Sequence, residues 1–525
     1  MPVTIIDLTG SRLDDWWDML MRRRYARSIW HWGGPLVVVF VASLLRLVGL
    51  AYPHELVFDE TYYVKDAWTL MHLGYEGLWG AEPNTAFNAG DPSGYQSNPE
   101  FLAHPPLGKW IISMGLALFG GGSSFGWRFS TAIVGIILVI LTMVIAWMLF
   151  RSTLLTVIAG GLIAIDGNAI VLSRVSLLDG IVALFALVGV ILVLLDRRWS
   201  QRRLEQWMAQ RTTAGSSTAW GPALWWRPWL ILAAFAFGLT SGVKWSGVYF
   251  LAGLAIYSLV TDLLARRKAG VAHWSAGTIL KQGPATFLIM VPLAAVTYVS
   301  VWAGWFVTKN GYDRHWAEAV SNQWHGLLSW VPIPLQSWYH FQAEIYNYNV
   351  NLHTPHSYQA NPLTWLFEVR PTSMFYHDLG NGSSTQILDV ANPLIWWACT
   401  AATFFLLVRA IWGVWRRQSV WREAFILTAI AAGYLPWVLF YSTRTVFQFY
   451  TIAFEPYLIL ALTAVLGILL GSAADAEARR VVGLRVVGIF LGVCALISLF
   501  FVPMWTGIPI PHWFVQLHYW FPSWI

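Results

Sequence analysis

Two adjacent carboxylates, Asp59 and Glu60, follow the first long hydrophobic run of this chain. If that run crosses a bilayer, both acids emerge at the far membrane face. Side chains of neighbouring residues diverge, so we expect one acid to face a site and the other to meet a structural cation. A carboxylate within hydrogen-bond reach of a hydroxyl can act as a general base. Asp59 could instead cap a helix that begins at Glu60, and the local sequence leaves both roles open.

Basic residues between later hydrophobic runs are candidates for binding a phosphate on the same face. Arg174 and Lys244 both lie in such short connections. A guanidinium can bind a phosphate with two hydrogen bonds, and a lysine adds a point charge. Arg174 could alternatively pair only with Asp179, because an acid inside a membrane needs a partner. The segment His104-Pro105-Pro106 is rigid and would hold His104 and Lys109 in fixed directions.

A group of histidines raises the question of a metal site. His353 and His356 flank Pro355, and His340 and His377 are nearby. Such spacing occurs in metal sites, but the sequence shows no cysteine or carboxylate completing a set at the usual intervals. We therefore expect a polar, aromatic surface that binds an acceptor, no metal ligands and no required cofactor. A divalent cation is compatible with the sequence but has no support in it.

The composition is that of a polytopic membrane protein. Hydrophobic residues make up 57% of the 525 positions and charged residues only 11%, whereas soluble proteins are about 25% charged. Cys399 and Cys494 lie inside hydrophobic runs and form no disulfide framework or redox motif. The sequence has no phosphate-binding lysine loop and no dinucleotide fingerprint. An activated donor at the far face would therefore have to be carried by a lipid.

Eleven hydrophobic runs predict an all-α fold with about eleven transmembrane helices, since a helix needs about 20 apolar residues to cross hydrocarbon. The runs lie near residues 33–51, 127–149, 153–172, 177–195, 228–241, 245–263, 284–306, 392–413, 422–441, 447–470 and 484–504. The short run at 228–241 and the segment Leu107–Phe119 give a range of ten to thirteen spans.

The basic residues predict the orientation. Most of the 33 Lys and Arg residues fall in segments that this count places on one side, which the positive-inside rule identifies as the cytoplasm. The formal charge of +6 is therefore a topology signal and does not indicate a nucleic-acid partner. Arg370 and Arg444 are among the cations on the far side, where each is expected to meet a carboxylate or a ligand phosphate.

The predicted organisation has five parts. Residues 1–32 form a cytoplasmic amphipathic N-terminus, 33–306 a transmembrane catalytic core with an extracytoplasmic loop at 52–126, 307–391 a second extracytoplasmic loop, 392–504 the C-terminal transmembrane helices, and 505–525 an extracytoplasmic C-terminus. Amphipathic helices are expected in the first loop, one of them from Glu60 to Leu73.

Taken together, these residues resemble the protein O-mannosyltransferase family of the C-type glycosyltransferase (GT-C) superfamily. The matching segments are Phe58–Tyr63, His104–Lys109, Ser173-Arg174 with Leu177–Asp179, Val243–Gly247 and, more weakly, His356–Tyr358, Asn361–Trp365 and Arg444-Thr445 with Phe449-Tyr450. They span nearly the whole hydrophobic chain. An acidic pair alone also occurs in sibling sugar transferases, so the likeness depends on the combination with His-Pro-Pro-Leu-Gly-Lys and Val-Lys-Trp.

The resemblance implies a GT-C fold and inverting transfer of mannose from a polyprenyl phosphate to Ser or Thr hydroxyls of secreted or translocating proteins. It implies catalytic roles for Asp59 and Glu60, with Asp59 as the base. Residues implied to bind the donor phosphate are Arg174, Lys244, His104 and Lys109. Further substrate-binding residues would be Tyr62, Tyr63, Asp179, Trp245, His353, His356, Arg370 and Arg444.

The resemblance also predicts location and partners. Eukaryotic members commonly carry a β-trefoil domain in the luminal loop, but residues 307–391 are too few for one, so this chain is similar to bacterial, actinobacterial-type members of the plasma membrane. Expected partners are polyprenyl phosphate mannose, a Ser/Thr-containing protein, membrane lipid and the secretion translocon. Two alternatives stay open. One is a sibling enzyme that transfers arabinose or aminoarabinose to a glycolipid, and the other is a lipid-sugar transporter, for which repeats and mid-bilayer polar residues would be expected.

Overall fold

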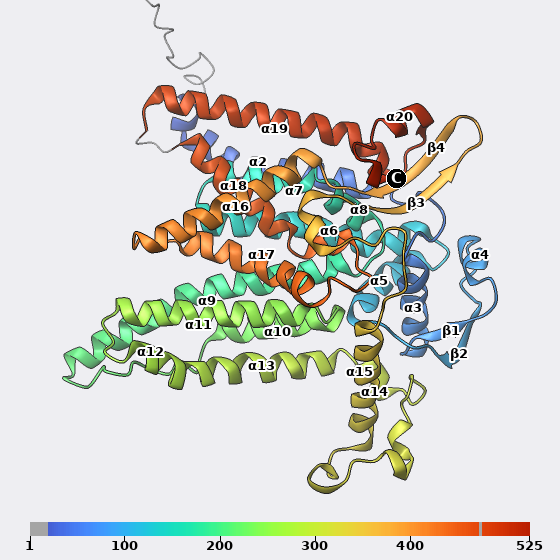
Figure 1. Cartoon of the computed structure of the whole chain (residues 1–525), viewed down its shortest axis with the longest axis horizontal. Coiled ribbons are helices and arrows are strands. Elements are labelled where there is room, and N and C mark those ends of the chain that lie inside the picture. Colours follow the sequence, from blue (N-terminus) through green and yellow to red (C-terminus); the bar gives the residue numbers. More distant parts are fainter. Residues whose placement is uncertain (1–18, 472–474) are drawn as a thin grey trace, which may run out of the picture.

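The computed structural model describes residues 19–471 and 475–525, and its long helices run side by side along one axis (Figure 1). Much of the amphipathic segment expected at 1–32 lies outside the described residues. Within the described ranges, eight helical segments are long and apolar enough to cross a membrane. They are α2 (Arg24–Leu47), α6 (Ser124–Phe150), α9 (Asp179–Thr213), α11 (Gly247–Lys268), α12 to α13 (Trp274–Ser300), α16 (Pro393–Trp415), α17 (Trp421–Phe440) and α19 (Glu477–Thr506).

Three further hydrophobic runs form shorter or broken helices. Helices α7 (Thr153–Ala164) and α8 (Gly167–Arg174) are bent by 59° where the Asp166 side chain caps α8. Helices α10 (Pro228–Val243) and α18 (Glu455–Leu470) are shorter than the eight long segments. All eleven predicted runs are therefore helical, which confirms the all-α polytopic class. Eight of them have the length of a complete span, or nine if the bent pair is one span, among the residues described.

The smaller elements gather at one end of the bundle, at the right of Figure 1. From the first loop they are α3 (Glu60–Leu73), β1 (Gly77–Trp79), α4 (Pro83–Asn88), β2 (Tyr95–Pro99) and α5 (Leu107–Phe119). From later segments they are α14 (Ala303–Val307), α15 (Ile333–Val350), β3 (Thr372–Asp378), β4 (Ser383–Asp389), β5 (Ile510–Pro511) and α20 (His512–Gln516). The predicted helix from Glu60 to Leu73 is thus confirmed. The end of α9, α12 and the turn between α16 and α17 lie at the opposite end.

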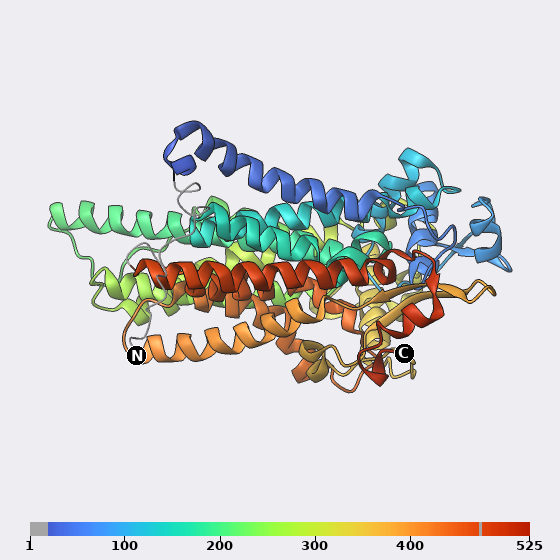
Figure 2. The ribbon, with the colours of Figure 1, turned by 90° about the horizontal axis from the view of Figure 1, so that it is seen from above.

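Two small antiparallel sheets belong to this loop end. Strands β1 and β2 pair within the first loop. Strands β3, β4 and β5 form the second sheet in that order, with Thr372 opposite Asp389 and Ser384 opposite Ile510. Figure 2 shows the β3–β4 hairpin extending beyond the bundle, and α2 along one of its edges. Residues 307–391, all of them described, contain no β-trefoil.

Buried ion pairs between side chains hold helix α10 at both of its ends. At its start, Arg227 pairs with Asp196 of α9 and Asp262 of α11, all three buried. At its end, Lys244 pairs with Asp179, the first residue of α9. Helices α9 and α10 also approach closely at Gly189 of α9, where a side chain would not fit. A Cβ atom added there would lie 2.5 Å from the ring of Phe237 in α10. This packing fixes Lys244 and Asp179 at the loop end of the bundle.

Candidate active site

The backbone turns at Phe58, directly before the two adjacent acids. Phe58 has a φ of 48°, an unfavourable conformation for a bulky residue. Asp59 follows at the start of α3, and its side chain makes no capping hydrogen bond to any described residue. The alternative that Asp59 serves as a helix cap is therefore wrong. The Asp59 side chain is left available for another role.

Glu60 is a fully buried structural acid. Its two oxygens accept hydrogen bonds from Arg128 Nε and Nη2, both at 2.8 Å, and from the main-chain N–H groups of Ser176 and Val57 at 2.8 and 3.0 Å. These four bonds leave no oxygen of Glu60 directed at a substrate. The expectation that one acid of the pair meets a structural cation is therefore met by Glu60, and the catalytic role expected for Glu60 stays a prediction.

The surroundings of Asp59 raise the pKa of its carboxyl group toward neutral pH. Burial raises the pKa of Asp59 to about 6; the Lys244 cation opposes this shift, the Asp179 anion adds to it, and the Tyr63 hydroxyl also opposes it. A base works best when its pKa is near the operating pH. Asp59 is thus suited to accept a proton at neutral pH.

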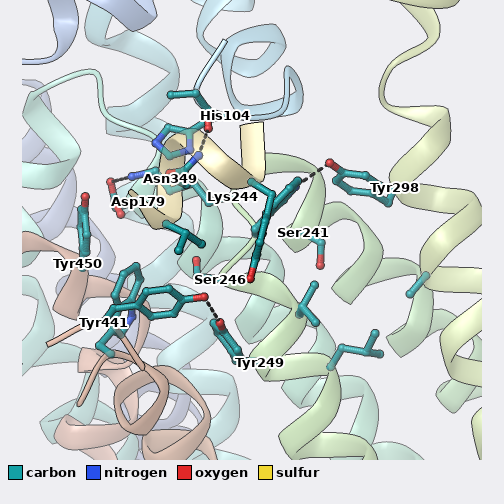
Figure 3. Close-up of a pocket in the computed structure, with 18 of the residues that line it drawn as sticks. His104, Asp179, Ser241, Lys244, Ser246, Tyr249, Tyr298, Asn349, Tyr441 and Tyr450 are labelled. Atoms are coloured by element: carbon teal, nitrogen blue, oxygen red, sulfur yellow. Dashed lines mark hydrogen bonds and ion pairs between the residues drawn. The ribbon is translucent and has the colours of Figure 1, made fainter. Parts of the chain in front are cut away.

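A cavity of about 490 Å³ opens at Lys244 and Asp179 (Figure 3). Asp59 is not among the described residues that line it, but both of these lining charges act on the Asp59 carboxyl. Its polar lining includes His104, Asp179, Lys244, Asn349 and Arg444. Its apolar lining comes from α11 and α13 and includes Val248, Leu251, Val291, Ala294 and Ala295. The cavity therefore has both a charged lining and an apolar lining supplied by membrane-spanning helices.

Lys244 and Asp179 form a buried ion pair in this cavity. Lys244 Nζ lies 2.7 Å from Asp179 Oδ2 and 4.9 Å from the centre of the Tyr450 ring (Figure 3). The alternative in which Arg174 pairs with Asp179 is therefore wrong, because Asp179 pairs with Lys244 instead. Lys244 keeps its expected place beside a ligand cavity.

Arg444 provides a guanidinium to the same cavity. Its Nη2 donates to Asn349 Oδ1 at 3.0 Å, and its carbon Cζ lies 5.9 Å from the centre of the Tyr441 ring. The buried Nε has no hydrogen-bond partner among the described residues. Arg444 therefore has an N–H group left for an anion.

His104 and Trp245 line the cavity as expected. Burial and the nearby cations Lys244, Lys109 and Arg444 hold the pKa of His104 well below its usual range, so its ring is neutral at pH 7. Trp245 Nε1 donates to the Tyr298 hydroxyl at 2.7 Å. These rings shape the cavity without adding charge.

Two cations expected at the donor phosphate form contacts within the protein, away from the cavity. Arg174 donates to the main-chain oxygens of Leu45, Arg46, Val48 and Gly49, and so caps the end of α2. Lys109 Nζ lies 3.0 Å from both Asp66 Oδ2 and Glu76 Oε1. Neither side chain is among the described residues that line the cavity. The N–H groups of Arg174 and Lys109 meet internal oxygens in this structure, and the phosphate roles of both residues stay predictions.

The remaining expected substrate residues lie outside the cavity lining that the structure describes. Tyr63 is buried near His104, with ring centres 6.2 Å apart, while Tyr62 is 59% exposed. His353 contacts the main-chain oxygen of Thr443. The other two pack at the surface of the loop end, His356 against the Phe58 and Phe447 rings, and Arg370 against Tyr358 and the main-chain oxygens of Ser357, Ser523 and Ile525.

Sequence reasoning missed several groups. Asn349, Tyr298, Tyr346 and Tyr441 line the cavity but lie in aromatic-rich segments without a distinguishing motif. A second omission is a group of ligand-type side chains at His340, formed by Asp313, His340 and Glu344. The expectation that no carboxylate completes a set with these histidines is therefore wrong. The spacing of His340 and Glu344, four residues apart on a helix, was the available signal.

Comparison with known proteins gives consistent matches over nearly the whole chain. The family model described as dolichyl-phosphate-mannose-protein mannosyltransferase matches residues 36–307, and the model for the C-terminal four-transmembrane region of protein O-mannosyltransferase matches residues 334–524. The polyprenol-phosphate-mannose–protein mannosyltransferase of Mycobacterium tuberculosis is 30% identical, with 92% of this chain and 89% of the relative covered. The enzyme of that name from Corynebacterium glutamicum is 28% identical, with 93% and 92% covered.

Solved structures support the same fold. The S. cerevisiae Pmt1-Pmt2 protein O-mannosyltransferase complex, bound to its sugar donor, matches with a TM-score of 0.68 at 15% identity, covering 94% of this chain and 92% of that chain. The oligosaccharyltransferase AglB of Archaeoglobus fulgidus matches with a TM-score of 0.51 at 15% identity, covering 95% of this chain and 59% of that chain. The predicted GT-C fold is thereby confirmed, and this multi-span membrane enzyme belongs to the dolichyl-phosphate-mannose–protein mannosyltransferase family.

Proposed function

We propose that this protein transfers mannose from a polyprenyl phosphate to Ser or Thr hydroxyls of proteins. The observation that carries the proposal is the cavity lined by Lys244, Arg444 and an apolar wall, whose Lys244–Asp179 pair is close enough to Asp59 to shift the pKa of that carboxyl. The names of the mycobacterial and corynebacterial relatives support a polyprenyl phosphate mannose donor and a protein acceptor.

The donor fits the cavity by its chemistry. A polyprenyl phosphate sugar joins a long apolar tail to an anionic headgroup and a polar ring. The apolar residues of α11 and α13 suit the tail, since both helices belong to the membrane-spanning set. Lys244 and Arg444 suit the phosphate, because cations stabilise negative charge most strongly in a site that excludes water.

The reaction follows as a single displacement. Asp59 accepts the proton of the acceptor hydroxyl as its oxygen forms a bond to the anomeric carbon. The bond from that carbon to the phosphate oxygen breaks, and its electron pair leaves with the polyprenyl phosphate. Lys244 and Arg444 offset the growing charge on the phosphate. Attack opposite the leaving group inverts the configuration of the anomeric carbon.

The active site is assigned to the extracytoplasmic face of the plasma membrane. The arginine-rich ends of α9 and α11 lie opposite the end that carries α3 and the small sheets (Figure 1). Basic residues favour the cytoplasmic side. The N-terminal end of α2 is then cytoplasmic, and Asp59 faces the compartment into which proteins are secreted.

A reconstituted assay tests the proposal. The full chain in liposomes is supplied with polyprenyl phosphate mannose and a Ser/Thr peptide, and mannosyl peptide is measured by mass spectrometry. We expect wild type to form it, Asp59→Asn to lose at least about 100-fold in rate as expected for a lost general base, and the exposed control Asp91→Asn to match wild type. Mannosyl peptide formed equally by Asp59→Asn would refute the base assignment. Transfer only to a glycolipid, or only from an arabinose-type donor, would support the sibling enzyme.

A further inference from the structure

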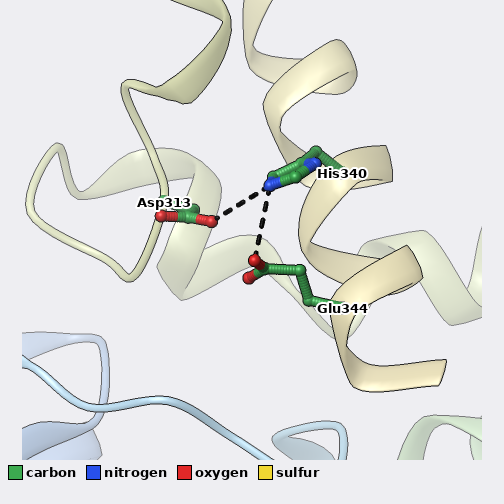
Figure 4. A group of neighbouring side chains, drawn as sticks. All are labelled: Asp313, His340 and Glu344. Atoms are coloured by element: carbon green, nitrogen blue, oxygen red, sulfur yellow. Dashed lines mark ion pairs between the residues drawn. The ribbon is translucent and has the colours of Figure 1, made fainter. Parts of the chain in front are cut away.

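Three side chains with metal-binding atoms meet in the second extracytoplasmic loop, apart from the cavity (Figure 4). His340 and Glu344 lie one turn apart on α15, so both side chains face the same direction. Asp313 reaches them from the segment that follows α14, through a backbone with a φ of 54°. The ligand atoms of all three lie within 4.8 Å of one another.

The separations within this group suit a shared cation better than direct hydrogen bonds. His340 Nε2 lies 3.5 Å from Asp313 Oδ2 and 3.5 Å from Glu344 Oε1. Hydrogen bonds between nitrogen and oxygen are usually 2.7 to 3.2 Å long. Ligand atoms about 2.0 to 2.1 Å from a tetrahedral zinc are separated by about 3.3 to 3.5 Å. Two edges of the group therefore have the length of edges of a zinc coordination tetrahedron.

The surroundings hold the group in place and leave it short of positive charge. The His340 ring stacks on Trp316 with centres 3.8 Å apart and planes 5° apart, which fixes the direction of Nε2. Glu344 Oε2 is enclosed and has no hydrogen-bond partner among the described residues. A divalent cation would relieve the repulsion between the two carboxylates.

We infer that Asp313, His340 and Glu344 form a structural site for a divalent cation of the zinc class. One imidazole and two carboxylates are a ligand set that zinc accepts, and the partly exposed side chains, 27%, 27% and 37% accessible, leave room for a water as the fourth ligand. The cation would join α15 to the segment after α14. The next turns of α15 carry Tyr346 and Asn349, which line the cavity, so the site would help to position them.

Metal content tests the inference. The full chain is purified in detergent without a polyhistidine tag, stripped with a chelator, and exposed to Zn²⁺; bound zinc is then measured by mass spectrometry after gel filtration. We expect one zinc per chain for wild type and a loss of that zinc for the pair His340→Gln with Glu344→Gln. The matched control is His315→Gln with Glu318→Gln, a histidine–carboxylate pair in the same loop, 2.7 Å apart and outside the three-ligand group. It should retain the zinc.

Two further measurements use only the wild-type protein, so they do not depend on whether the variants fold. Co²⁺ in place of Zn²⁺ should give the strong visible absorption of a four-coordinate site, and Zn²⁺ should raise the melting temperature of the stripped protein in a saturable way. Zinc bound equally by wild type and His340→Gln/Glu344→Gln, or non-saturable binding without a cobalt spectrum or a thermal shift, would mean an adventitious ion only and overturn the inference. A melting temperature of the stripped protein that does not respond to Zn²⁺ would also overturn it.

Discussion

Glu60 and Arg128 form a buried ion pair with two parallel hydrogen bonds, Oε1 to Nε and Oε2 to Nη2, each 2.8 Å long. Arg128 also donates to the main-chain oxygen of Pro53, and Glu60 accepts from the main-chain N–H of Ser176. The pair therefore joins α3 and α6 to the segment between α8 and α9. Because Asp59 immediately precedes Glu60 in the chain, this structural pair also fixes the position of the proposed base.

Arg128→Ala should destabilise the protein strongly. The substitution leaves Glu60 as a buried, unpaired charge, which costs about 3 to 5 kcal/mol. Thermal unfolding in detergent measures the effect. The control is Arg409→Ala, which removes a half-exposed pair with Glu423 and should cost no more than about 1 kcal/mol. Equal melting temperatures for wild type and Arg128→Ala would contradict the structural role of Glu60.

Transfer should fail as the pH drops through the pKa of Asp59. That pKa is about 6, so below pH 6 the carboxyl is increasingly protonated and cannot accept the acceptor proton. We expect kcat/KM to fall about tenfold per pH unit below this point and to level off above pH 7. An initial-rate profile with the Ser/Thr peptide measures this. A profile that stays flat down to pH 4 would contradict the assignment of Asp59, with its pKa of about 6, as the base.

The same shift predicts a stability effect with a definite sign. Folding raises the pKa of Asp59 from 3.8 to about 6, so the folded state disfavours the ionised form. This penalty is absent below pH 3.8, develops as the pH rises to 6, and is complete above it. Asp59→Asn should therefore melt higher than wild type at pH 8, and the difference should shrink toward pH 4. A variant that melts lower than wild type at pH 8 would contradict the burial of the charge.

Arg444 and Arg174 should behave differently when truncated. Arg444→Ala removes the guanidinium group from the cavity. A hydrogen bond to a charged group contributes about 1.5 to 3 kcal/mol. Its loss should therefore lower kcat/KM for the donor by about 10- to 100-fold. Arg174→Ala leaves the carbonyls at the end of α2 unpaired and should lower the melting temperature instead. Arg370→Ala serves as the control for rate. A larger rate loss in folded Arg174→Ala than in Arg444→Ala would return the phosphate role to Arg174.

Lys244 and Asp179 can be separated by a double substitution. Lys244→Met leaves Asp179 buried and unpaired, so both stability and turnover should fall. Adding Asp179→Asn should restore much of the melting temperature, because it removes the buried, unpaired carboxylate. It should not restore turnover, because the donor phosphate still lacks the Lys244 cation. Wild type, Lys244→Met, Asp179→Asn and the double variant form a cycle, which is measured by thermal unfolding and by the mannosyl transfer assay. Full recovery of turnover in the double variant would exclude Lys244 as a phosphate ligand.

The apolar wall of the cavity should set the dependence on the prenyl chain. Ala295 is an exposed residue of α13 that lines the cavity, so Ala295→Trp would fill part of the proposed tail groove. We expect KM to rise for a long-chain donor and to change less for a donor with a short prenyl chain. Ala401→Trp places the same ring on an exposed position of α16 and is the control. An equal effect on long and short donors would argue against this groove.

The sequence by itself determined the class of this protein, its helical runs and the expectation that one acid of the pair Asp59 and Glu60 meets a structural cation. Hydrophobic runs of spanning length predict helices because the free energy of moving apolar residues into hydrocarbon accumulates locally along the chain. The helix Glu60–Leu73 was predictable for a similar reason, since its pattern is contained within its own residues. Adjacency alone made it clear that the two acids point in different directions.

Only the tertiary structure decided which cations serve the cavity. Arg174, Lys109, Lys244 and Arg444 are all basic residues at the same end of the bundle, and residue type does not say which oxygen each one meets. Arg174 meets the end of α2, more than a hundred positions earlier in the chain, and Lys109 meets Glu76 of the first loop. Such pairings are set by the packing of helices distant in sequence. A buried cation takes the nearest oxygens that packing supplies. Of these four, only Lys244 and Arg444 also line the cavity.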